Sequence, residues 1–301
     1  MSDKLKSNLA ASVRQRLLNI SQKRKEPFDL ILSHYAIERF LYRLSHSKYS
    51  DRFLLKGAML FSIWMNEMHR PTRDVDFLGF GENDEVELAD IFRELCNLPV
   101  EPDGLVFDPA TVKAKSIREE AAYAGIRVTM VARLENALIP VQADVGFGDA
   151  VTPAPQEIIF PVLLDFPAPT LRAYPIYTVV AEKLEAMIYL GEPNSRMKDF
   201  FDVWFLSQRF EFSGEILTEA IHSTFARRKT PISQELPAAF SDSFAAMKEL
   251  QWNSFLKRNG LVQAPFAEVL KSLQNFAVRP LEAALTDKAF SLHWQPNGPW
   301  Q

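Results

Sequence analysis

The sequence predicts an α+β domain followed by a helical domain. Three observations carry this prediction: apolar residues recur with a helical period near the N-terminus, alternate with the strand period between about residues 105 and 147, and return to a helical period after Pro175. With 301 residues, 47% of them apolar, the chain is long enough for one large or two modest domains. We place the boundary after residue 165, which gives predicted domains 1–165 and 166–301.

Elements of the first domain follow in chain order. Residues 4–46 predict two helices separated by Pro27, and the helix expected over 57–66 should bury Met59, Leu60, Ile63 and Trp64. The other helix is expected over 85–98. Strands are predicted over 53–55, 75–80, 105–107, 111–117, 125–133 and 138–147.

Residues 151–175 are rich in proline and are interpreted as a linker that holds one short strand, 158–164. The second domain is then predicted to be helical. Its expected helices are 177–190, 195–209, 213–227, 232–256 and 266–277, before a polar tail from Trp294.

Composition excludes several classes of protein. Cys96 is the single cysteine, which rules out an intramolecular disulfide framework and a cysteine-based zinc cluster. No apolar run is long enough to span a bilayer, and the N-terminus lacks a secretory signal, so we expect no membrane partner and a cytoplasmic location. The histidines show no zinc-protease spacing, and neither a Walker A nor a dinucleotide-binding motif is present.

The net charge of -4 provides no global field that would attract nucleic acid. Any polynucleotide must therefore be held by local basic groups, each of which is otherwise an ordinary solvated surface. The candidates are 23–25, the trio Lys113, Lys115 and Arg118, and 227–229.

A D-x-D pair follows the small-residue turn at Gly57 and Ala58. Because side chains alternate across a strand, Asp74 and Asp76 should face the same way, away from Val75 and Phe77. Two carboxylates on one face repel each other unless a cation lies between them, and oxygen ligands of this kind suit Mg²⁺.

Asp144 lies in the middle of a predicted strand, opposite in direction to Val141, Ala143 and Val145. It is either a third carboxylate of the metal site, which would also help to activate an attacking hydroxyl, or a solvated residue of an edge strand. Three such carboxylates would hold two metal ions for in-line displacement at phosphorus.

Lys183 falls on the apolar side of a predicted helix, which is unusual unless its ammonium group meets an anion or reaches solvent along the domain edge. A triphosphate is one such anion. Asp199 and Asp202 share a face of the next helix, where they form either a second half of the site or ordinary acids near a helix start that Ser195 caps. One of these acids could orient Lys183 by pairing with it.

These motifs, in this order, resemble the AbiEii/AbiGii (also MenT-type) toxins of the DNA polymerase β-like nucleotidyltransferase superfamily. The resemblance extends from about residue 28 to 210. It rests on the segments 40–45, 53–60, 73–77, 181–186 and 196–202. It implies a bilobed fold, with a small mixed β-sheet lobe with flanking helices and a helical lobe that closes over the nucleotide.

The resemblance also implies roles at the matching positions. Asp74 and Asp76 match the metal-binding pair, Lys183 the essential lysine, and Asp199 the acid of the R-x-K-D motif. With Asp144, these are the predicted catalytic residues. The predicted nucleotide-binding residues are Lys56, Gly57, Ala58, Lys183, Arg196, Lys198 and Asp202. Ala58 departs from the Gly or Ser usual in the family, and it offers no hydroxyl to a phosphate.

The expected function is that of a toxin of a toxin–antitoxin or phage-defence system. The expected reaction is Mg²⁺-dependent transfer of NMP from an NTP to an RNA acceptor, a tRNA 3′ end, and the expected partner is a cognate antitoxin. Alternatives are transfer to a protein or small molecule, and a non-catalytic relative that binds a nucleotide or partner. Phosphorylation of Thr72 is a further hypothesis for antitoxin control, against a plain structural role at the start of the strand.

Overall fold

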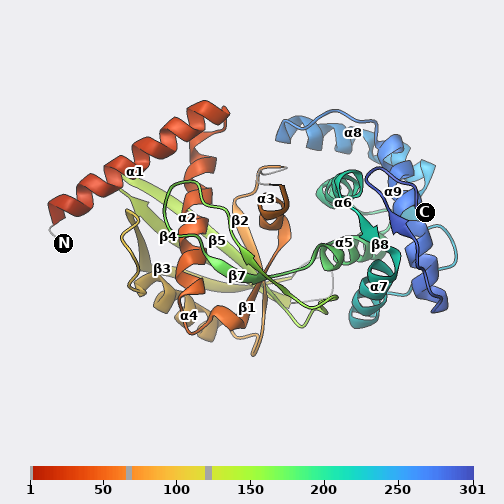
Figure 1. Ribbon diagram of the computed structural model, residues 1–301, viewed down its shortest axis with the longest axis horizontal. Coiled ribbons are helices and arrows are strands. Elements are labelled where there is room, and N and C mark those ends of the chain that lie inside the picture. Colours follow the sequence, from red (N-terminus) through yellow and green to blue (C-terminus); the bar gives the residue numbers. More distant parts are fainter. Residues whose placement is uncertain (1–2, 66–69, 119–123) are drawn as a thin grey trace. The chain divides into compact units, whose positions relative to one another are not determined.

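The computed structural model describes residues 3–65, 70–118 and 124–301 (Figure 1). The chain divides into two compact units: unit 1 comprises 1–148 and 156–173, and unit 2 comprises 149–155 and 174–301. The predicted boundary after residue 165 falls within the second segment of unit 1. Unit 1 is a mixture of helices and sheet and unit 2 is largely helical, so the chain has the α+β organisation that the sequence predicts.

Seven described strands of unit 1 form one mixed sheet in the order β3-β4-β5-β2-β1-β7-β6. The strands are β1 (Phe53–Lys56), β2 (Asp74–Gly79), β3 (Leu105–Arg118), β4 (Ala124–Leu134), β5 (Ala137–Phe147), β6 (Gln156–Ile159) and β7 (Thr170–Ala173). The central strands β2 and β5 run parallel, whereas β1 pairs antiparallel with β2 and β4 antiparallel with β5.

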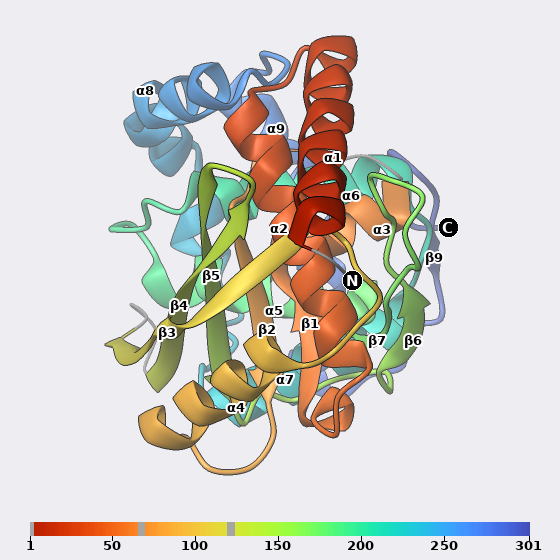
Figure 2. The ribbon, with the colours of Figure 1, turned by 90° about the vertical axis from the view of Figure 1, so that its left-hand side faces the viewer.

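The helices of unit 1 are α1 (Asp3–Arg24), α2 (Phe28–Ser45), α3 (Leu60–Met65) and α4 (Glu85–Asn97). Helices α2 and α4 contact each other and the sheet (Figure 2). Phe40 of α2 stacks on Phe92 of α4, and Phe53 links Phe92 to Phe77 of β2. The core therefore lies on the Phe77 side of β2, which leaves Asp74 and Asp76 on the opposite face of the sheet.

Several predictions in unit 1 need correction. The strands expected over 105–107 and 111–117 are one strand, β3, whose register shifts between Asp108 and Lys113. The helix expected over 57–66 is a short 3₁₀ turn (Gly57–Met59) followed by α3. Ile63 and Trp64 are half-buried rather than buried, and Phe61 takes the core position; Asn66 lies outside the described residues.

The proline-rich segment is not simply a linker. Residues 156–159 and 170–173 form β6 and β7, a hairpin that extends the sheet edge, and the strand expected over 158–164 ends at Ile159. The prolines of this segment all lie outside these two strands, so none of them removes a ladder donor.

Unit 2 contains α5 (Ile176–Leu190), α6 (Met197–Arg209), α7 (Gly214–Arg228), α8 (Asp242–Asn259) and α9 (Phe266–Thr286), with the short pair β8 (Phe212–Ser213) and β9 (His293–Trp294). The helix predicted over 232–256 begins only at Asp242. Pro231 and Pro237 interrupt the helical pattern, and the Ser241 hydroxyl accepts a hydrogen bond from the Phe244 amide at the true start.

The C-terminal end also differs from the prediction. Helix α9 continues past Ala277 through Pro280, and the carbonyl of Phe276, which loses its helical donor at Pro280, accepts a hydrogen bond from the Trp300 indole at 2.9 Å. Trp294 and Trp300 are buried, so the segment expected as a polar tail packs on the core of unit 2. Among the described residues, no helix has the length and apolar character needed to cross a membrane.

Candidate active site

A row of four charged residues crosses the open face of the unit 1 sheet. Asp76 of β2 lies beside Asp144 of β5 in the parallel register, Arg127 of β4 lies opposite Asp144, and Lys56 of β1 lies opposite Asp76. Cross-strand partners project from the same face, so the row reads cation, acid, acid, cation. Asp74 lies on the same face two residues before Asp76.

Asp144 is held by a two-pronged ion pair. Arg127 donates from Nε to Oδ1 at 2.8 Å and from Nη2 to Oδ2 at 2.7 Å. The Asp144 side chain is 13% exposed, on a strand between β4 and β2. The alternative of a solvated edge residue is therefore wrong.

Arg127 is the part of this row that the sequence prediction missed. Its hydrogen bonds with Asp144 raise the pKa of Arg127 above its usual range, burial opposes this, and the charges of Asp144, Asp74 and Asp76 add to the increase. Arg127 is thus attracted by all three acids. A signal was present in the sequence: the predicted strands 125–133 and 138–147, folded as a symmetric hairpin, place residue 127 opposite residue 144.

Gly57 allows the close approach of β1 to Asp76. Its φ of +75° belongs to the left-handed region, and a Cβ at this position would overlap the Asp76 carboxylate. The next residue, Ala58, is buried. Only glycine therefore leaves Asp76 in its present position.

Thr72 fixes the first acid of the pair. Its hydroxyl donates to Asp74 Oδ1 at 2.6 Å, and its backbone carbonyl is 2.9 Å from the His34 ring. Burial lowers the pKa of His34. Thr72 itself is 7% exposed and its hydroxyl is engaged, which gives it a structural role; its phosphorylation remains a hypothesis.

The donor chemistry of this face suits a hard divalent cation. Asp74 and Asp76 offer oxygen ligands from one strand face, the type of donor that Mg²⁺ prefers. In the described part of the chain, however, no three acidic, histidine or cysteine side chains are grouped as a ready-made metal site. Asp144, the third predicted ligand, is paired with Arg127 instead.

Unit 2 contains a second, separate set of predicted residues. Lys183 of α5 lies 2.7 Å from Asp199 Oδ1 and 2.8 Å from Asp202 Oδ2, and Arg196 Nε lies 2.8 Å from Asp199 Oδ2. The two acids are 2% and 0% exposed and Lys183 is 14% exposed. The prediction that an acid pairs with Lys183 is therefore confirmed, by both acids rather than one.

The pKa of Asp199 in this cluster reflects two opposing effects, burial and nearby positive charge. Burial acts to raise the pKa of Asp199, but the charges of Lys183 and Arg196 outweigh it and the pKa is lowered. Lys198, on the other side of the same helix turn, is exposed. The alternative in which Ser195 caps α6 is wrong: the helix begins after Arg196, whose amide donates to the Asn194 side chain.

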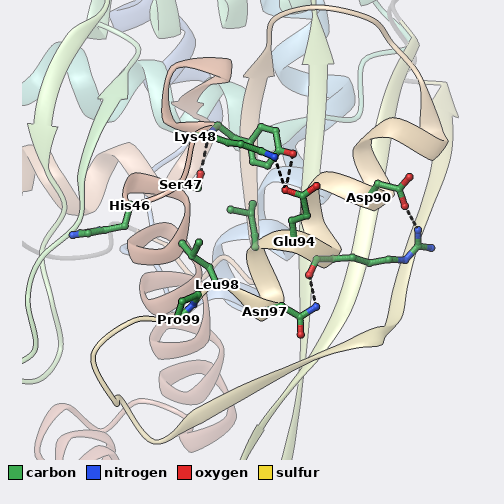
Figure 3. A pocket seen from close by; sticks show the side chains of 11 residues that line it. His46, Ser47, Lys48, Asp90, Glu94, Asn97, Leu98 and Pro99 are labelled. Atoms are coloured by element: carbon green, nitrogen blue, oxygen red, sulfur yellow. Dashed lines mark hydrogen bonds and ion pairs between the residues drawn. The ribbon is translucent and has the colours of Figure 1, made fainter.

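Two other features of the chain contribute none of the predicted site residues. Arg228 is buried in ion pairs with Glu185, Asp149 and Glu182, so the segment 227–229 is not a phosphate-binding patch centred on that side chain. A surface hollow of about 710 Å³ lies between the end of α2 and α4. In it Lys48 and Glu94 point toward each other and pair at 2.9 Å (Figure 3).

Comparison with known proteins identifies the family of this chain. A family model described as "Nucleotidyl transferase AbiEii toxin, Type IV TA system" matches residues 39–277. Because the match covers most of the chain, the protein belongs to the AbiEii nucleotidyltransferase toxin family. Membership implies a nucleotide substrate and an antitoxin partner, and the resemblance predicted from the motifs is confirmed.

Two solved structures from Helicobacter pylori are similar at low sequence identity. A protein provisionally described as a nucleotidyltransferase is 14% identical, with a TM-score of 0.45 over 86% of this chain and 98% of its own. The protein JHP933 is also 14% identical, with a TM-score of 0.41 over 81% of this chain and 97% of its own. No curated protein sequence matches this chain.

Proposed function

We propose that this toxin transfers NMP from an NTP to an RNA acceptor, a tRNA 3′ end, in a Mg²⁺-dependent reaction. The observation that carries the proposal is the charged row on the unit 1 sheet, where Asp74, Asp76 and Asp144 gather on one face with a cation at each end. In such a reaction the enzyme contributes mainly positioning and charge neutralisation, and this row offers both.

The metal role falls to Asp74 and Asp76, which would hold Mg²⁺, a Lewis acid that neutralises phosphate charge when it is bound. Thr72 keeps Asp74 in its rotamer through the 2.6 Å hydrogen bond, and Gly57 leaves room for Asp76. Lys56 extends the positive charge along the row toward the β- and γ-phosphates.

Asp144 acts on the acceptor. Arg127 holds it in a fixed rotamer through two hydrogen bonds, and a remaining lone pair of its carboxylate would accept a hydrogen bond from the attacking 3′-hydroxyl. A bond forms between this oxygen and the α-phosphorus, the bond to the β-phosphate oxygen breaks, and pyrophosphate leaves. The hydroxyl proton passes to Asp144 and then to water.

The Lys183 cluster of unit 2 is assigned to the triphosphate. Its ammonium group is oriented by Asp199 and Asp202, and Arg196 balances the second oxygen of Asp199. Ala58, beside the Gly57 turn, is a further proposed nucleotide contact, whereas Lys198 is exposed and is not part of this cluster. The support for an RNA acceptor comes from family membership together with the toxin role, because blocking a tRNA 3′ end stops growth.

The test is incubation of the purified protein with each α-labelled NTP, Mg²⁺ and total RNA, beside the variant Asp76→Ala. Label on tRNA that is lost by about 10³-fold in the variant supports the proposal. Label on a protein or small molecule would move the proposal to that acceptor. Growth inhibition that survives in Asp76→Ala would favour a non-catalytic, partner-binding relative.

A further inference from the structure

A cationic groove lies in unit 2 between the start of α6 and the C-terminal half of α8. It has a volume of about 380 Å³. Its lining includes three cations, Arg196, Lys198 and Arg258, and contains no acidic side chain. In a chain with a net charge of -4, such a local concentration of positive charge stands out.

The two sides of the groove are fixed to each other. Gln251 of α8 donates to the Ser195 carbonyl at 3.2 Å, and the ring of Phe255 packs 5.9 Å from Phe201 of α6. The groove is therefore part of the packed unit and presents its charges in a set geometry.

Two of the three cations, Lys198 and Arg258, are the groups of the groove that a ligand would meet. The amide of Gln251 is used by Ser195, and the hydroxyl of Ser254 donates to the Leu250 carbonyl at 2.8 Å. Within the described part of the chain, Lys198 and Arg258 form no ion pair with an acid, and both are exposed. Such a surface recognises phosphate charge rather than base identity.

Lys198 and Asp199 show that this groove differs from the triphosphate cluster. Asp199 turns into the core to meet Lys183, whereas its neighbour Lys198 turns outward to the groove. Arg196 links the two, because it pairs with Asp199 at 2.8 Å and also lines the groove.

We infer that this groove binds the phosphodiester backbone of the single-stranded RNA end that serves as acceptor. The inference rests on the proposed RNA transferase function, and it assigns Arg258 and Lys198 to phosphates and the half-buried Phe255 ring to stacking with a base. Cations beside an aromatic ring form the usual surface for single strands, and this combination favours RNA over an acidic protein segment.

The test measures equilibrium binding of a short fluorescent single-stranded RNA to the full chain over a series of salt concentrations, without NTP or Mg²⁺. Arg258→Gln is expected to weaken binding about fivefold and to reduce the slope of log K against log salt by about 0.7. Ser254→Lys, which adds a cation to the same groove, is expected to strengthen binding by a similar factor. Lys257→Gln, the neighbour on α8 outside the groove lining, is the matched control and should change little.

Equal effects of Arg258→Gln and Lys257→Gln, or no gain from Ser254→Lys, would overturn the assignment. Weaker binding of poly-glutamate by Arg258→Gln with unchanged RNA binding would overturn it as well and give the groove to an acidic protein partner. Because this assay requires no catalysis, it stays separate from the labelling test: RNA transfer without groove binding refutes only the groove.

Discussion

The two charged clusters of this protein differ in how their neighbouring acids are neutralised. In unit 2 Lys183 lies between two buried acids, and Arg196, 28% exposed, pairs with the second oxygen of Asp199, so two cations balance two acids. In unit 1 two acids lie beside each other and the cations stand at the ends, with Arg127 42% exposed. The first arrangement is complete by itself, whereas the second leaves adjacent carboxylates that a divalent cation would stabilise. The lysine cluster should therefore matter most to folding and the row most to chemistry.

Replacing Lys183 and, separately, Lys56 by methionine gives the largest expected difference in stability between the two units. Lys183→Met removes the cation between buried Asp199 and Asp202 and leaves Arg196 beside Asp199, so we expect unit 2 to lose about 3 kcal/mol. Lys56 is half-buried, so Lys56→Met should lower the stability of unit 1 by less than about 1 kcal/mol. Hydrogen–deuterium exchange measures both units in one sample. Equal losses of stability in the two units would contradict the view that the lysine cluster matters more to folding than the charged row does.

Gly57 tests the row itself. Gly57→Ala is expected to displace Asp76 and to lower NMP transfer about 100-fold, with a loss of about 1–2 kcal/mol of stability. Gly260→Ala is the matched control: it also has a positive φ, of +64°, but has open space at the Cβ position. It should cost about 1 kcal/mol and leave transfer unchanged. Similar transfer rates in the two variants would show that Asp76 needs no such clearance.

The pH dependence of stability is a further test of the lysine cluster of unit 2. The pKa of Asp199 is lowered, so its stabilisation is present above the usual value of 3.8 and is lost as the pH falls through the lower folded value. Lys183 is the largest of the charges that lower the pKa of Asp199. Without Lys183 we expect burial to outweigh the remaining charge of Arg196 and to raise that pKa above 3.8, which reverses the sign. The deficit of Lys183→Met should then shrink by about 1–2 kcal/mol between pH 7 and pH 5 in urea unfolding. Tryptophan fluorescence is a suitable signal, since four of the five tryptophans lie in unit 2. A deficit that is constant with pH would contradict this account.

The sequence predicted the acids of both clusters because each depends on a local period. Alternation in β2 and β5 places Asp74, Asp76 and Asp144 opposite their apolar neighbours, and helical spacing places Asp199 and Asp202 on one face. The lysines of both clusters were predicted too, but Arg127 was missed. Arg127 meets Asp144 only through the register of the β4–β5 hairpin, in which Leu134 lies opposite Ala137 and Glu135 takes a φ of +54°. The Glu-Asn pair at that turn lacks the glycine that usually marks such a hairpin.

The errors in the fold have a related cause. The strand β7 and the burial of Trp294 and Trp300 depend on partners distant in sequence, β1 and α9 respectively, which no local pattern indicates. The groove side chain Arg258 likewise joins Lys198 only through the packing of α8 against α6. Local periods thus predict which face a residue occupies, and tertiary packing decides what lies beside it.

The smallest expected effect concerns Arg127, and its sign is informative. Arg127→Gln removes a positive charge from beside three acids and releases Asp144, so Mn²⁺, used in place of Mg²⁺ for its paramagnetic signal, should bind about fivefold more tightly. NMP transfer should fall by about the same factor, because Asp144 is no longer held in one rotamer. Arg133→Gln, an exposed arginine on the same face of β4 opposite Leu138, is the control for long-range charge. If both variants bind Mn²⁺ alike, Arg127 contributes only general charge. If metal affinity rises while transfer falls in Arg127→Gln alone, the arginine keeps Asp144 for the acceptor and away from the metal. The acids of the unit 1 row then have different roles, two binding the metal and one the acceptor, whereas both acids of the unit 2 cluster bind the same lysine.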